Sequence, residues 1–93
     1  MRIISFMVII IANLVSDMVT DEAWQAKAKG LLKGELKRRG IGYRDLAARL
    51  AAMGVPETEQ NIANKISRGG FSAVFLIQCM EAVGCRNLQI GVD

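Results

Sequence analysis

Residues 54–70 have the sequence GVPETEQNIANKISRGG, and this stretch determines the fold that we expect. A proline keeps the chain extended after a glycine, and Thr58 is then a suitable N-cap for a helix. Ile62 and Ile66 are four residues apart, which places them on one edge of that helix. A pair of glycines ends it. The stretch therefore predicts a turn followed by a short helix over 58–68 with one buried edge.

The opposite edge of this predicted helix is polar. Its glutamine, asparagine and arginine side chains are well suited to hydrogen bonding with base edges in the major groove of DNA, and a serine lies among them. Any surface helix displays such residues somewhere, so a solvated face without a partner remains an alternative. We predict that this edge contacts bases through five residues: Gln60, Asn61, Asn64, Ser67 and Arg68.

The charge of the chain is unevenly distributed. The 93 residues are enough for one domain and carry a net charge of +3. Residues 27–49 hold eight lysines and arginines but only two acids, a local net charge of +6. Such a block favours a polyanionic partner, although a basic face also serves solubility alone. We predict phosphate contacts from four residues in and beyond this block: Lys33, Lys37, Arg44 and Lys65.

The composition argues against enzymatic chemistry. The chain has no histidine, which removes the commonest general base and metal ligand. Cys79 and Cys85 lack the spacing of a zinc site, and we expect them to stay reduced in the cytoplasm. No nucleophile–base set, paired carboxylates or glycine-rich phosphate loop occurs in the sequence. We therefore expect no enzyme activity, no metal and no cofactor.

Three further segments have helical patterns, and a glycine follows each. The first helix should begin at a cap on Thr20 or Asp21 and end before Gly40. Its inward stripe would be apolar: Trp24, Ala28, Leu31, Leu32 and Leu36. The next helix, over 43–53, has its own inward set: Leu46, Ala47, Leu50 and Met53. The segment 71–83 is apolar at ten of thirteen positions and should be the central core helix.

The apolar extension over residues 1–19 has several explanations that the sequence leaves open. It is shorter than the roughly 20 apolar residues of a membrane-spanning helix, and no signal-peptide cleavage motif follows it. Met18 stands directly before a helix-start signal, so we favour a mis-assigned start. A weak membrane anchor, or an added strand or helix, are the alternatives. A membrane is expected as a partner only if this extension is translated.

The C-terminal tail, residues 85–93, alternates apolar and polar residues over 87–93. This pattern is typical of a short strand, and a lone strand needs a partner. The apolar extension or the same tail of a second copy could pair with it. Since 71–83 is also more apolar than one domain can cover, a homodimer through 71–93 is a further expectation.

Several landmarks resemble the Cro/C1-type (XRE) repressor domains across roughly residues 31–84. They are Leu36-Lys37-Arg38-Arg39-Gly40, Leu46-Ala47-Ala48-Arg49-Leu50, Gly54-Val55, Ile66-Ser67-Arg68-Gly69 and Ala82-Val83-Gly84. A richer string is similar to a family of small bacterial domains that carry only a domain-of-unknown-function label. It joins Trp24, Glu57-Thr58-Glu59, Asn61-Ile62, Asn64-Lys65-Ile66-Ser67-Arg68-Gly69, Phe71-Ser72-Ala73 and Gln78-Cys79.

The repressor resemblance implies an all-α, lambda-repressor-like helix-turn-helix domain of four to five helices over residues 20–84. It also implies a transcriptional regulator of double-stranded DNA, with helix 58–68 in the major groove. Gln60 and Asn64 would then bond adenine edges, and Arg68 a guanine or a phosphate. The alternative is a protein-interaction module, antitoxin-like or regulatory, that uses helix 71–83.

Overall fold

The structure is a computed structural model that describes residues 21–91. In this range the chain forms four helices and no strand: a first helix over 21–38, α2 (Tyr43–Ala52), α3 (Glu59–Arg68) and α4 (Ala73–Val83). The prediction of an all-α domain is confirmed. None of the helices described there has the length and apolar character needed to cross a membrane. The predicted extension over 1–19 and the cap at Thr20 lie outside the described residues, and Asp21 is already helical.

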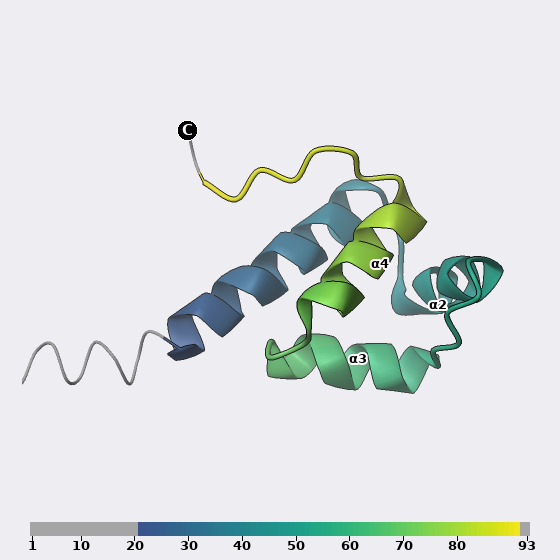
Figure 1. Cartoon of the computed structure of the whole chain (residues 1–93), viewed down its shortest axis with the longest axis horizontal. Coiled ribbons are helices and arrows are strands. Elements are labelled where there is room, and N and C mark those ends of the chain that lie inside the picture. The colour runs from purple at the N-terminus through teal and green to yellow at the C-terminus, as the bar shows by residue number, and fades with distance from the viewer. Residues whose placement is uncertain (1–20, 92–93) are drawn as a thin grey trace, which may run out of the picture.

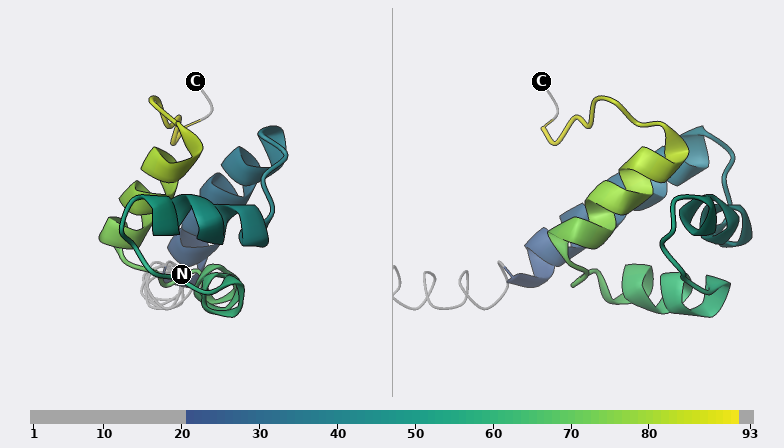
Figure 2. Two further views of the ribbon diagram at one scale, coloured as in Figure 1. Left: turned by 90° about the vertical axis from the view of Figure 1, so that its right-hand side faces the viewer. Right: turned by 45° about the vertical axis from the view of Figure 1, so that its right-hand side comes forward.

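The helices form two pairs, of which one is parallel and the other crossed. The first helix and α4 lie side by side and run in the same direction (Figures 1 and 2). α2 is seen end-on in Figure 1 and lengthwise in the left view of Figure 2. α3 is seen lengthwise in Figure 1 and end-on in the left view of Figure 2, so these two helices cross steeply. α3 forms the lower edge of the molecule in Figure 1 and ends beside the start of α4. This arrangement leaves one long side of α3 facing away from the other helices.

All four helices contribute to a single hydrophobic core. The six largest fully buried side chains come from every helix, and each is 0% exposed: Leu32, Leu46, Leu50, Ile62, Ile66 and Cys79. Around them lie five more buried apolar residues: Leu36, Ile41, Phe75, Met80 and Val83. Burial of one aliphatic side chain stabilises a fold by about 1.5–3 kcal/mol, so this cluster is the main source of stability.

Side-chain caps and glycines define where the helices begin and end. The hydroxyl of Thr58 accepts a hydrogen bond from the backbone N–H of Asn61 at 3.0 Å, and Ser72 caps α4 in the same way. The cap at Thr58 was predicted from the sequence. Glycines with positive φ follow the four helices, at positions 40, 54, 69 and 84. Only glycine adopts this left-handed conformation without strain, which is why each helix stops there.

Three sequence predictions about the core and tail are wrong. Trp24 is 60% exposed, because the start of the first helix projects beyond α4 (Figure 1). Met53 is 43% exposed, because α2 ends at Ala52 and Met53 belongs to the turn. The tail forms no strand over 85–91, since no second strand exists in the described range to pair with it. Its Leu88 packs against the core instead, while Ile90 is exposed.

Candidate nucleic-acid interface

The orientation of α3 is fixed by its two isoleucines. Ile62 and Ile66 are both fully buried in the core, and α3 packs against α2 on that side. Because these side chains define the inward edge, the helical repeat turns the polar edge outward. All five residues that we predicted to contact bases are exposed: Gln60, Asn61, Asn64, Ser67 and Arg68. The structure thus brings them together on one accessible side of α3.

Two of these exposed side chains hold each other in place. The Nε2 of Gln60 donates a hydrogen bond to the Oδ1 of Asn64 at 3.2 Å, one helical turn away. This bond leaves the Oε1 of Gln60 as a free acceptor and the Nδ2 of Asn64 as a free donor. The pair therefore presents an acceptor and a donor side by side, on a rigid helix rather than on a loop.

The first helix holds the end of α3. Lys29 donates from its amine to the backbone carbonyl of Ser67 at 3.3 Å. Gly69, which ends α3, is buried against the backbone of Gln25, and an added Cβ would lie 2.8 Å from the carbonyl oxygen there. The sequence did not predict this contact, because a glycine that ends a helix does not reveal which other helix approaches it. The first helix therefore sets where the C-terminal end of α3 lies.

The predicted phosphate-contacting residues have different surroundings. Lys33, Lys37 and Arg44 are exposed. Lys33 and Lys37 follow Lys29 at steps of four residues, about 6 Å each, so they extend from the end of α3 along the first helix. Lys65 is different, because it pairs with the carboxylate of Glu57 and its amine lies 4.9 Å from the centre of the Phe75 ring. Its charge is thus already engaged within the domain.

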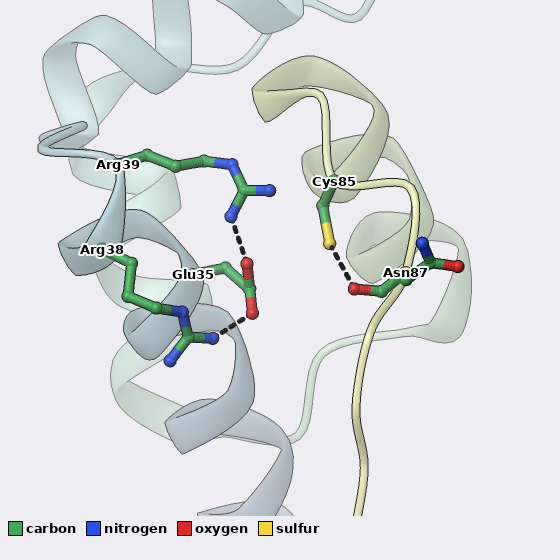
Figure 3. A network of polar contacts seen from close by, with 5 residues as sticks. All are labelled: Glu35, Arg38, Arg39, Cys85 and Asn87. Carbon is green, nitrogen blue, oxygen red and sulfur yellow. Dashed lines mark hydrogen bonds and ion pairs between the residues drawn. The ribbon is translucent and has the colours of Figure 1, made fainter.

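A second charged cluster lies on the first helix and was not predicted as a site. Glu35 is only 7% exposed and forms ion pairs with Arg38 and Arg39 (Figure 3). The hydrogen bond from Arg38 holds the pKa of Glu35 below its usual value, against the opposing effect of burial, and Arg39 acts in the same direction. The spacing of three and four residues was the sequence signal for these pairs.

The two cysteines differ in their exposure. Cys79 is fully buried in α4, and burial raises the pKa of its thiol to about 12. Cys85 is half-buried, and its thiol donates a weak hydrogen bond to the carbonyl of Asn87 at 3.4 Å. Both thiols are free. Across residues 21–91, no three histidine, cysteine or acidic side chains gather as a metal site would require.

Comparison with known protein families gives a match over most of the chain. The sequence model of a protein family described as "Domain of unknown function (DUF6471)" matches residues 24–88. The matched range runs from the first helix to the beginning of the tail and includes all of α2, α3 and α4. No curated protein and no solved structure matches the chain.

Proposed function

The chain belongs to the family described as a domain of unknown function (DUF6471), and we propose that it is a small DNA-binding protein which inserts α3 into the major groove. One observation carries this proposal. Ile62 and Ile66 are buried while every predicted base-contacting side chain on α3 is exposed. A helix anchored on one edge and polar on the other is what a major groove admits. The resemblance to the Cro/C1-type repressors supports a role in transcriptional regulation.

The hydrogen-bonded pair on α3 supports recognition of adenine. In the major groove adenine offers the N7 acceptor and the N6 donor. The free donor of Asn64 and the free acceptor of Gln60 complement these two atoms. Arg68 is exposed in the last turn of α3 and would contact a guanine edge or a phosphate. Each well-paired contact discriminates against a wrong base by about 1–3 kcal/mol.

The exposed cations beside α3 support binding to the DNA backbone. Lys29 touches the carbonyl of Ser67, so the face of the first helix that carries Lys33 and Lys37 begins at the end of α3. In the proposed complex Lys33, Lys37 and Arg44 neutralise phosphates. Lys65 would contribute only after release from Glu57. Affinity should therefore fall with salt, by a log–log slope of about −0.9 for each phosphate contacted.

A binding selection with the purified full chain tests this proposal. Random duplexes that the protein retains are sequenced, and the same selection is run with the double variant Gln60→Ala, Asn64→Ala. The proposal predicts a short enriched motif that contains adenine for the natural chain, and loss of that motif for the variant. A variant that still enriches the same motif would show that α3 does not contact those bases. Retention without any enriched motif would refute sequence-specific binding.

A second copy of the chain is part of the proposal. One domain of this size covers a short DNA segment, and paired half-sites are how such domains reach useful affinity. Val74 and Ile77 lie three residues apart on α4 and are 64% and 65% exposed. We propose that a homodimer through 71–93 buries these side chains. Sedimentation equilibrium of the full chain should then show a dimer that Ile77→Asp dissociates.

The same apolar side chains favour the alternative function, a protein-interaction module in which another protein covers α4. The two functions differ in what Ile77→Asp does. If the protein is a DNA-binding dimer, the variant binds a single half-site with the same base preference but loses the higher affinity for two paired half-sites. For the interaction module, the natural chain and the variant alike show no base preference. A selection with each protein separates these outcomes.

A further inference from the structure

A groove of about 840 Å³ lies between the second half of the first helix and the tail. Figure 3 shows Asn87 in the tail across from Glu35, Arg38 and Arg39, which all line this groove. This volume lies within the range of pockets that hold small molecules, which is about 300–1,000 Å³. None of the residues proposed to contact DNA lines this groove.

The charged groups that line the groove favour an anion. Lys27, Arg38 and Arg39 contribute three positive charges against the single carboxylate of Glu35. That carboxylate is buried, and it holds one end of each guanidinium in place. A guanidinium has five N–H donors, and the two arginines use only part of theirs on Glu35. The donors that remain are pre-oriented for another carboxylate, a geometry that arginine binds well.

A glycine keeps the floor of the groove open. Gly30 lies inside the first helix, where glycine destabilises a helix by about 1 kcal/mol relative to alanine. No atom lies within 4 Å of the position that its Cβ would occupy. One turn later, a Cβ on Gly34 would lie 3.5 Å from the guanidinium of Arg38. Gly30 thus leaves open a part of the groove surface that a side chain would occupy, and Gly34 lets the guanidinium of Arg38 lie close to the helix.

The other lining groups suit a ligand with an apolar body. Leu31 is half-buried on the first helix, and the exposed Ile90 lines the groove from the tail. The amides of Asn87 and Gln89 also line the tail side. We propose that this groove binds a small organic acid, with its carboxylate at Arg38 and Arg39 and its apolar body between Leu31 and Ile90.

Benzoate is a simple probe of this site. In a titration of the full chain followed by amide resonances, benzoate should shift residues 30–39 and 87–91 and reach saturation. Benzyl alcohol keeps the ring but lacks the charge, and inorganic phosphate has the charge but lacks the ring. Both should bind more weakly by roughly tenfold or more. Equal binding of benzoate and phosphate would overturn the proposal in favour of a simple charge effect, and equal binding of benzyl alcohol would overturn it in favour of apolar contact alone.

Two variants complete the test. Gly30→Leu should fill the floor and weaken benzoate binding by roughly tenfold or more, without loss of melting temperature, because leucine favours a helix. Arg49→Gln removes a positive charge outside the groove, and its benzoate binding should equal that of the natural chain. Unchanged binding by Gly30→Leu, or an equal loss in Arg49→Gln, would overturn the proposal. Neither result depends on DNA binding. The benzoate titration and the DNA selection can therefore refute their two proposals separately.

Discussion

Replacement of Gly69 by alanine should destabilise the domain more than the same change at any other glycine that ends a helix. Two costs combine at this position. The backbone has a φ of 72°, in the left-handed region that alanine adopts only with strain. The new Cβ would also lie 2.8 Å from the carbonyl oxygen of Gln25, so a backbone segment of the first helix has to shift. Gly84 shares the first cost, with a φ of 76°, but has no atom within 4 Å of its Cβ position.

The two costs can be estimated separately. Left-handed backbone costs a non-glycine residue roughly 1–2 kcal/mol. Overpacking of a tight contact adds typically about 1–3 kcal/mol. Gly84→Ala should therefore lose about 1–2 kcal/mol of unfolding free energy, since only the backbone strain applies. Gly69→Ala should lose about 2–5 kcal/mol, because both costs apply.

Chemical unfolding of the full chain, followed by circular dichroism, measures both losses directly. In a domain of this size, 1 kcal/mol corresponds to a shift of roughly 4–8 °C in melting temperature, so the two variants should separate clearly. Equal losses in Gly69→Ala and Gly84→Ala would refute the close approach of the first helix to the end of α3. The position of α3 would then need another explanation.

Three further predictions follow from the caps and titratable groups. Thr58→Ala removes the N-cap of α3 and should cost about 1 kcal/mol of unfolding free energy, measured by denaturant titration. The hydrogen bond from Arg38 lowers the pKa of Glu35, so the ionised carboxylate should stabilise the fold fully above the ordinary value of 4.5 and lose that effect as the pH falls through the lowered pKa. Glu35→Gln should remove this part of the acid dependence of the unfolding free energy, and an unchanged pH profile in the variant would contradict the prediction. Because burial raises the pKa of Cys79 to about 12, thiol reagents should label Cys85 first in the native protein, and Cys79 only after unfolding, as peptide mass analysis would show.

Local signals predicted the helices well. Thr58 is a cap whose hydroxyl bonds only to the helix that follows it. The spacing of four residues between Ile62 and Ile66 predicts that they share one buried edge of the helix. A glycine marks the end of each helix because only glycine adopts the left-handed conformation without strain. These features depend on neighbours in the sequence, and the structure confirms each of them.

Contacts between distant segments could not be predicted in the same way. Lys65 belongs to the polar helix by sequence, but the turn brings Glu57 to its amine and α4 brings the Phe75 ring beneath it. Trp24 has the periodicity of a core residue, yet the first helix extends past the helices that would cover it. Glu35 is only 7% exposed, and its spacing from Arg38 and Arg39 indicated the ion pairs but not the burial. Each of these outcomes depends on how the helices pack.

In the proposed complex the outward edge of α3 contacts bases while the exposed lysines of the first helix contact phosphates. Fluorescence anisotropy with the selected duplex and its single-base variants, over a range of salt concentrations, separates these two kinds of contact. Asn64→Ala should lose roughly 5- to 150-fold discrimination at one base position and keep the natural salt dependence. Lys33→Ala should weaken binding to all duplexes alike and reduce the salt slope by about 0.9. If Asn64→Ala keeps full discrimination at every position, α3 does not contact bases in the way proposed.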